Sequence, residues 1–209
     1  MLFLNGCATT SEAPSSAAID KMKSEDEYFK KGTECVRTGD YDGAIAEFTK
    51  AIELNPGFGG AYIRRGYAHN VKGNHDQAIS DFTKAIELNP DYVDAYSNRG
   101  YAYHVKGNHD QAISDFNKAI EINPESADAY YGRGIAHASK SDFDQAISDY
   151  TRAAQLKPDF AEAYKTRAVA YYYKQEYAKA REDANKAEAL GARVNPEFLE
   201  QLKKHQAEN

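Results

Sequence analysis

Apolar residues recur along the chain at the spacing of an α-helix. Between residues 78 and 86, Ala78, Ile79, Phe82, Ala85 and Ile86 fall on one helical face, and polar residues occupy the positions between them. The alanines and the aromatic residue of this stripe return at a constant interval before and after this segment. The pattern predicts a series of amphipathic helices and favours no strand.

The interval between these stripes is 34 residues, and Pro56, Pro90, Pro124 and Pro158 follow one another at the same interval. Taking Pro as position 32 divides residues 25–194 into five units: 25–58, 59–92, 93–126, 127–160 and 161–194. Position 4 is tyrosine in every unit: Tyr28, Tyr62, Tyr96, Tyr130 and Tyr164. We expect these tyrosines in the core. Alanine stands at positions 20 and 27 of every unit, which lets helices approach closely.

Each unit contains the residues that end and begin helices. Position 15 is Gly39, Gly73 or Gly107 in the first three units, and glycine just past a helix takes the left-handed conformation at little cost. Position 16 is Asp or Asn in the first four units, a good N-cap for a second helix. In the first three units an Asn-Pro pair then stops that helix: Asn55-Pro56, Asn89-Pro90 and Asn123-Pro124. Each unit is therefore predicted to be helix, tight turn, helix, turn.

Tyr at position 4, Gly at 8, Ala at 20, Phe or Tyr at 24, Ala at 27 and Pro at 32 resemble the tetratricopeptide repeat (TPR). The resemblance covers residues 25–194. It implies an all-α fold, a right-handed superhelical α-solenoid of helix-turn-helix repeats. Residues 195–209 are predicted to form a C-terminal capping helix and tail, in which Phe198, Leu199 and Leu202 cover the last apolar face.

Two repeated charges predict a ladder of ion pairs. Position 7 is Arg65, Arg99, Arg133 or Arg167, and position 23 of the same units is Asp81, Asp115, Asp149 or Asp183. The first unit changes both partners together, to Lys31 and Glu47. We expect each pair to join the two helices of its unit, because a charge matched in every unit is explained without a ligand.

Composition narrows the function classes. The chain has 209 residues, 28% of them charged, a net charge of −6 and two cysteines. No apolar run is long enough to span a bilayer, and the acidic balance disfavours nucleic-acid binding. No catalytic constellation or phosphate loop is visible, and histidines share their repeat positions with other rings, so we expect a non-enzymatic protein without cofactor or metal.

The N-terminal segment, residues 1–24, has the pattern of a truncated signal and tether. Leu4-Asn5-Gly6-Cys7 resembles the lipobox of bacterial lipoproteins, and a Ser/Thr/Ala/Pro-rich stretch follows it. Only three apolar residues precede the box, too few for a signal peptide. Either a leader lies upstream of Met1 and Cys7 carries lipid on the periplasmic side of the cell envelope, or the protein is cytoplasmic and the motif is accidental. We favour the first.

The TPR resemblance also implies a binding site. In that family the first helix of each unit lines a concave groove, chiefly through positions 2, 5, 9, 12 and 13. Carried over, these positions predict the following contacts: Phe29, Ile63, Tyr67, Asn70, Ser97, Tyr101, His104, Tyr131, Ile135, Lys165 and Tyr172. Position 2 adds an acidic rim of Asp26, Asp94, Asp128 and Glu162, with Gly60 as the exception.

These features predict a scaffold that binds a peptide or helix of a partner protein in an aromatic and aliphatic groove. Contact with a membrane would be through the lipid anchor alone. The alternative is a soluble cytoplasmic scaffold, or a protein that self-associates as a homo-oligomer.

Overall fold

The structure, a computed structural model, describes residues 16–207, with side chains described over residues 24–204. The described residues form α-helices and turns and contain no strand. The helices are α1 Ser16–Thr38, α2 Tyr41–Leu54, α3 Gly59–Val71, α4 His75–Leu88, α5 Val93–Val105, α6 His109–Ile122, α7 Ala127–Ser139, α8 Phe143–Leu156, α9 Ala161–Tyr173, α10 Tyr177–Ala189 and α11 Pro196–Ala207.

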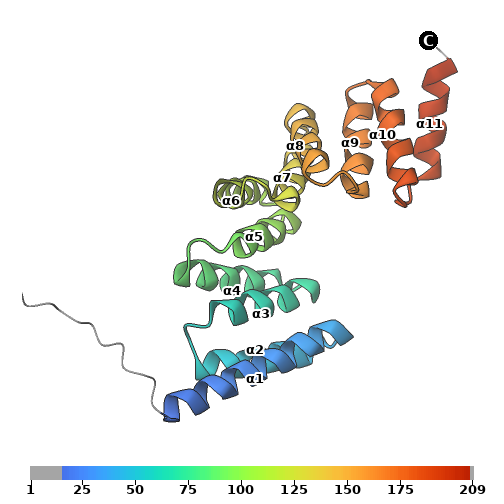
Figure 1. The fold of residues 1–209 in the computed structure, drawn as a ribbon. Coiled ribbons are helices and arrows are strands. Elements are labelled where there is room, and N and C mark those ends of the chain that lie inside the picture. The colour runs from blue at the N-terminus through green and yellow to red at the C-terminus, as the bar shows by residue number, and fades with distance from the viewer. Residues whose placement is uncertain (1–15, 208–209) are drawn as a thin grey trace, which may run out of the picture.

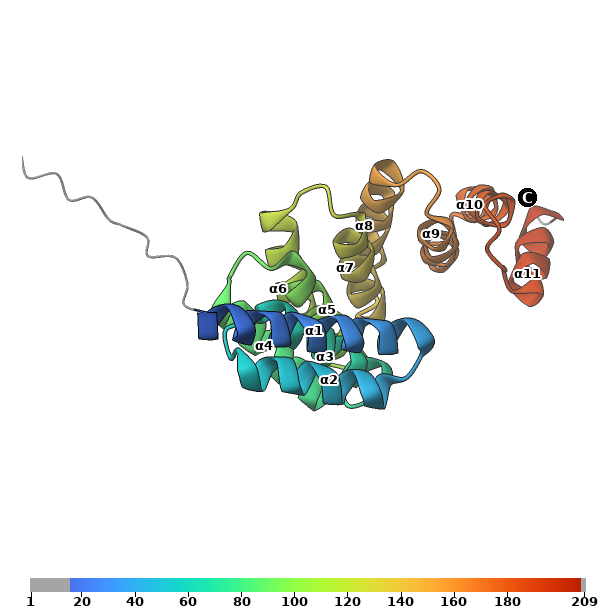
Figure 2. The same ribbon diagram turned by 60° about the horizontal axis from the view of Figure 1, so that its bottom comes forward.

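Consecutive helices pack in pairs, and the pairs stack in chain order. Each odd-numbered helix from α1 to α9 packs most extensively on the helix that follows it, and each even-numbered helix then contacts the first helix of the next pair. Figure 1 shows the pairs rising as an open, curved array, with α1 and α11 at opposite ends, and Figure 2 shows the curve from another side. The prediction of an α-solenoid is confirmed.

Helix α1 is longer than the first helix of the other pairs. It begins at Ser16, so residues 16–24 are helical where the sequence pattern predicts tether. Ala17, Ala18, Lys21 and Met22 have high intrinsic helix propensity. This propensity favours a helix that begins before the first unit. The lipobox residue Cys7 lies outside the described residues.

The turns inside the pairs use the residues that the sequence marks. Gly39, Gly73 and Gly107 have φ near +80°, the left-handed region in which glycine has no Cβ penalty. Ser141 and Gln175 take the same place in the last two units with φ of 62°. The cap prediction holds in part: Asp40 and Asp142 accept hydrogen bonds from backbone amides of the next helix, whereas Asn74 and Asn108 make no such bond.

The core is built from small residues, with one large buried ring at position 24 in each of the first four pairs. Alanines at positions 20 and 27 are fully buried in every unit, and the largest buried rings stand at position 24: Phe48, Phe82, Phe116 and Tyr150. The expectation that all position-4 tyrosines are core is wrong, since only Tyr96 is buried, at 8% exposed. Tyr28, Tyr62, Tyr130 and Tyr164 are half-buried, and a Lys or Arg side chain lies over each of their rings.

Helix α11 closes the C-terminal end as predicted. It packs on α10, and its Leu202 is 1% exposed among Ala184, Ala187 and Val194. Phe198 and Leu199 contact the same cluster, and the Phe198 ring meets Tyr172 at 5.4 Å. The apolar face of the last pair is thus covered by the chain itself.

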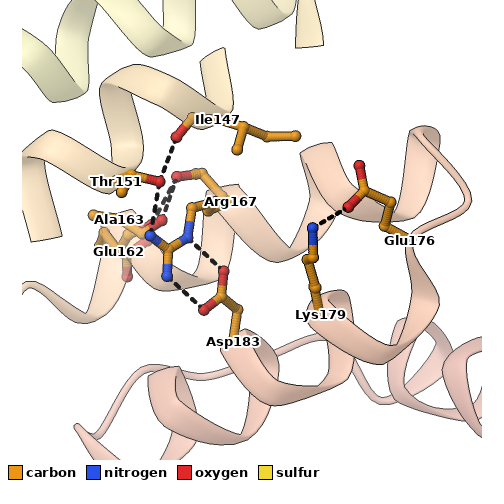
Figure 3. A network of polar contacts seen from close by, with 9 residues as sticks. Ile147, Thr151, Glu162, Ala163, Arg167, Glu176, Lys179 and Asp183 are labelled. Atoms are coloured by element: carbon orange, nitrogen blue, oxygen red, sulfur yellow. Dashed lines mark hydrogen bonds and ion pairs between the residues drawn. The ribbon is translucent and has the colours of Figure 1, made fainter. Parts of the chain in front are cut away.

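The predicted ion-pair ladder is present in units two to five. Arg65 Nε and Nη2 donate to Asp81 at 2.9 and 2.7 Å, and Arg99, Arg133 and Arg167 repeat this two-pronged geometry with their own aspartates. The third donor, Nη1, reaches back to Thr49, Thr83, Asn117 or Thr151 of the preceding unit. Figure 3 shows Arg167 between Asp183 and Thr151. Each arginine therefore also joins neighbouring pairs.

The predicted rung between Lys31 and Glu47 is wrong. Lys31 pairs with Glu27 one turn earlier on α1, and Glu47 pairs with Lys50 on α2. Among the described residues, 16–207, no helix pair packs on the far side of α1, and Lys31, which is 54% exposed, takes a partner on its own helix. The Arg–Asp pairs are therefore found in units two to five, where each arginine is largely buried between its own unit and the preceding one.

Candidate functional site

The odd-numbered helices line the inner face of the array. Each of α1, α3, α5 and α7 contacts the next odd-numbered helix, and no two even-numbered helices within residues 16–207 contact one another to that extent. An array whose first helices lie closer together than its second helices curves around the first ones. The solvent-facing residues of α1, α3, α5, α7 and α9 therefore lie on the concave, inner surface of the array.

This inner face carries the exposed apolar residues. Six large hydrophobic side chains are exposed within residues 24–204, and five of them lie on α3, α5 or α9: Tyr67, Val71, Val105, Val169 and Tyr173. They stand at positions 9 and 13 of their units, one helical turn apart. The sixth, Leu88, ends the even-numbered helix α4. We call the five residues the inner stripe.

Several pockets lie along the inner face, and two of them hold several predicted contacts or exposed apolar residues. One, between α7, α8 and α9, has a volume of ≈ 470 Å³ and is lined by Ile135, Phe143, Tyr150, Val169 and Tyr173 with small or hydroxyl residues between them. Its lining contains no charged side chain. We call it the α7–α9 pocket. Tyr173 forms its edge, where the ring stacks flat on Phe143 at 4.8 Å.

The second pocket, of ≈ 270 Å³, lies between α1, α3 and α5 and holds three of the predicted contacts. Phe29, Ile63 and Tyr67 line it, together with Arg64, Tyr92, Asp94 and Asn98. The Phe29 ring packs there against Phe48 and Phe58, with ring centroids 5.5 Å and 4.8 Å away. We call it the α1–α5 pocket. Its walls are apolar and its rim carries one cation and one carboxylate.

The predicted contacts in the middle of the groove are partly engaged in the fold. The Tyr101 hydroxyl donates to the backbone oxygen of Asp128 at 3.1 Å, and burial raises its pKa. The Nδ1 of His75 and the Oδ1 of Asn70 are hydrogen-bonded at 2.7 Å. His104 lies 5.0 Å from His109, ring to ring, and burial lowers its pKa. Asn70, Tyr101 and His104 thus contact other residues of the fold and are only partly exposed on the inner face.

The remaining predicted contacts lie towards the C-terminal end. Ile135 lines the α7–α9 pocket, and Tyr131 stands nearby with its ring on Phe160 and its pKa raised by burial. Lys165 is held by Glu162 on the same helix. Tyr172 packs on Phe198 of the cap, so it joins α9 to α11. Ser97 is half-buried on α5. Whether any of these residues binds a ligand stays a prediction.

The acidic rim consists largely of unpaired carboxylates. Asp26, Asp94 and Asp128 are exposed, and no ion pair or hydrogen bond engages their carboxylates within the described side chains, whereas Glu162 is paired with Lys165. The aspartates at position 18, by contrast, each bind a lysine of the following unit: Asp42–Lys72, Asp76–Lys106, Asp110–Lys140 and Asp144–Lys174. The carboxylates of the acidic rim therefore remain largely free, whereas the aspartates between consecutive units are neutralised by lysines.

The structure adds Val71, Val105 and Tyr173 to the site. The sequence suggested Tyr173 as a further contact, but it did not single out Val71 and Val105, although position 13 lies one turn from position 9 on the same helical face. A comparison of position 13 across the units would have identified Val71 and Val105. Val105 and Tyr173 are the most exposed of the inner stripe, at 59% and 62%.

Over the described residues, no group of three or more His, Cys, Asp or Glu side chains is placed to hold a metal ion. No described helix has the length and apolar character required to cross a bilayer. Cys35 is a free, partly buried thiol whose pKa is raised by burial, which makes it less reactive.

The solenoid is similar to several solved structures, although no curated protein matches by sequence. MamA shares 28% identity and a TM-score of 0.68, over 83% of this chain and 96% of that chain. YrrB, described as a TPR protein with an unusual peptide-binding site, shares 23% identity and a TM-score of 0.68, over 92% of this chain and 98% of that chain. PilF of Pseudomonas aeruginosa shares 18% identity and a TM-score of 0.80, over 88% of this chain and 85% of that chain.

Family models match the repeats directly. Tetratricopeptide repeat models match residues 25–58, 93–126 and 127–160, in the register set by the prolines. A further TPR repeat model matches residues 66–107, so the matches together span more than half of the chain. With the stacked helix pairs, they establish that the chain belongs to the tetratricopeptide repeat family.

Proposed function

We propose that this protein is a non-catalytic adaptor, which binds a peptide or helix segment of a partner protein on the inner face of its solenoid. The inner stripe is the observation that carries the proposal. Soluble domains bury most large apolar side chains, and a row of exposed ones marks an interaction surface. Five of the six exposed large apolar residues in the described side chains lie on this one face.

The rigidity of the framework supports the same use. The arginine ladder and the lysine–aspartate pairs tie each unit to the next, so the inner helices present their side chains in a fixed order. A surface that is already ordered loses little conformational entropy when it binds. Rings such as Tyr67 and Tyr173 supply large contact area with few rotatable bonds.

The test is affinity capture by the full chain, with variants that replace exposed apolar residues. Val105→Ser/Tyr173→Ser removes two residues of the inner stripe, and Leu88→Ser removes the exposed apolar residue on the outer helix α4. We expect the inner double variant to lose the partner that the wild type and Leu88→Ser retain. Equal recovery by all three proteins would refute the groove assignment, once circular dichroism shows that all three are folded.

We further propose that the adaptor is anchored in a bacterial cell envelope through lipid on Cys7. The support is the lipobox-like Leu4-Asn5-Gly6-Cys7 and the Ser/Thr/Ala/Pro-rich residues after it. Anchoring by acyl chains requires no spanning helix. The native locus, expressed with the sequence upstream of the Met1 codon and fed an alkyne fatty acid, should give labelled wild type and Cys35→Ser protein. Label that persists in Cys7→Ser, or is lacking in the wild type, would contradict the anchor.

A further inference from the structure

The groove has an internal order of apolar and charged parts, and this order narrows what the proposed ligand segment must be. The α7–α9 pocket is open, uncharged and mostly apolar, with Tyr173 at its edge. A pocket of this kind accepts an aliphatic or aromatic side chain, and it gives no reason for a charged one to enter. It supplies an anchor point at one end of the groove.

The next stretch of groove, along α5 and α7, carries net negative charge. Both helices contain an arginine, but Arg99 and Arg133 are each bound by the aspartate of their own unit. The lysines that follow these helices, Lys106 and Lys140, are bound by aspartates of the preceding units. The basic side chains of this stretch are thus already neutralised.

Two carboxylates of this stretch remain without a partner. Asp94 lies in the first turn of α5 and Asp128 in the first turn of α7. Asp94 lines the α1–α5 pocket beside the exposed ring of Tyr67, and the Tyr101 ring reaches the backbone of Asp128. A carboxylate next to an aromatic ring favours an ammonium or guanidinium group, which gains from both.

The acidic stretch is bounded at both ends by unpaired cations. Arg64 of α3 lines the α1–α5 pocket, and Arg193, between α10 and α11, lines a pocket next to the α7–α9 pocket. Neither forms an ion pair with a described side chain. A basic ligand residue placed against Arg64 or Arg193 would be repelled, whereas one placed at Asp94 or Asp128, between them, would be attracted. Beyond Arg64, the free carboxylate of Asp26 lies on α1.

From this order, and on the basis of the proposed function, we propose that the bound segment carries basic side chains that pair with Asp94 and Asp128 and an apolar side chain that fills the α7–α9 pocket. Neighbouring helices pack about 8–10 Å apart, a distance that about three residues of extended chain span. The basic residues of an extended ligand are therefore about three residues apart, and the apolar residue lies on the side towards α9.

The experiment is selection from a phage-displayed library of random peptides on the full chain, followed by fluorescence anisotropy of the selected peptides. Asp94→Asn and Asp128→Asn remove the two free charges with little change of shape. The matched control is Asp76→Asn/Asp110→Asn, because it removes the same charge from aspartates that bind Lys106 and Lys140, at the opposite ends of α5 and α7.

We expect the selected peptides to be enriched in pairs of Lys or Arg near an aliphatic or aromatic residue. Each of Asp94→Asn and Asp128→Asn should weaken binding about two- to fivefold, as for an exposed ion pair, and added salt should weaken binding by the wild type. The control pair should bind the peptides like the wild type.

Peptides without basic enrichment, or with unchanged affinity for the Asp94→Asn/Asp128→Asn protein, overturn this inference. If those peptides still lose affinity for Val105→Ser/Tyr173→Ser, the groove remains the binding site and the proposed function stands. If no peptide is selected, or all bind the inner-stripe variant as well as the wild type, both the inference and the proposed function fail.

Discussion

At the scale of single residues, each internal arginine at position 7 contacts three groups from two units. Arg99 donates to Asp115 through Nε and Nη2 and to Thr83 of the preceding unit through Nη1, while its guanidinium lies over the Tyr96 ring. Its side chain is 16% exposed, so little water competes for these donors. Arg99 therefore links the two helices of its own pair and also joins that pair to the preceding one.

The first prediction concerns this arginine. Arg99→Ala and Asp115→Ala should each destabilise the protein by roughly 3–5 kcal/mol, because each leaves a largely buried charge without its partner. A double-mutant cycle in urea should give a coupling energy of about 1–3 kcal/mol. The exposed pair Lys106–Asp76 is the control, with an expected coupling below about 1 kcal/mol. Additive effects at Arg99 and Asp115 would contradict the ladder.

A second prediction concerns pH. Burial lowers the pKa of His104, with the neighbouring His109 as a smaller cause, so the folded state favours neutral imidazole more than the unfolded chain does. The resulting stability is complete above the unfolded pKa of about 6.5 and is lost as pH falls through the window below it. Thermal melts between about pH 7.5 and pH 5.5 should show a smaller loss for His104→Asn, the residue that unit two has at this position. An equal loss in wild type and variant would contradict this.

At the scale of the elements, the helix pairs follow from the repeat because each stop and start has a local cause. Gly39, Gly73 and Gly107 take left-handed turns, and the Asn before each of three prolines ends a helix. The reach of Arg65 to Thr49 was not predicted, although position 25 carries a hydrogen-bonding side chain in all four cases. A contact between units joins different repeat positions, here 7 and 25, whereas the repeat pattern compares only equivalent positions.

The close approach of helices gives a prediction at this scale. A Cβ on Gly132 would lie 2.4 Å from the buried Phe116 ring of the preceding unit, whereas one on Gly60 would meet its nearest neighbour at an ordinary 3.4 Å. We expect Gly132→Ala to destabilise by about 1–3 kcal/mol through overpacking, and Gly60→Ala to stabilise by up to about 1 kcal/mol through helix propensity. Urea unfolding measures both. Equal effects of the two substitutions would show that the α6–α7 seam is looser than described.

At the scale of the whole molecule, the two ends of the array are finished differently. The outer side of α1 carries the ion pairs Lys31–Glu27 and Arg37–Glu34, and the last pair is covered by α11. The apolar stripe of residues 196–205 was sufficient to predict the cap. Which groove residues take part in packing could not be predicted, because Tyr101 and Tyr67 share one repeat position: Tyr101 bonds to the backbone of the next unit, whereas Tyr67 is exposed.

Removal of the cap should convert the C-terminal end into an apolar surface. A chain ending before Pro196 loses Phe198 and Leu202, and it exposes Ala184, Ala187 and Tyr172. Loss of a fully buried leucine alone costs about 1.5–3 kcal/mol. We expect a lower melting temperature and concentration-dependent association by light scattering, with the full chain unchanged over the same range. A truncated protein as stable and as dispersed as the full chain would contradict the capping role.

The central claim is that the inner face of the solenoid binds a partner protein. Photo-crosslinking in cells tests it most directly, with p-benzoylphenylalanine placed singly at Val71, Val105 and Tyr173 of the inner stripe and at Leu88 on the outer face. We predict that the three inner positions crosslink to the same partner and that Leu88 does not. Crosslinks from Leu88 alone, or from all four positions alike, would contradict the claim.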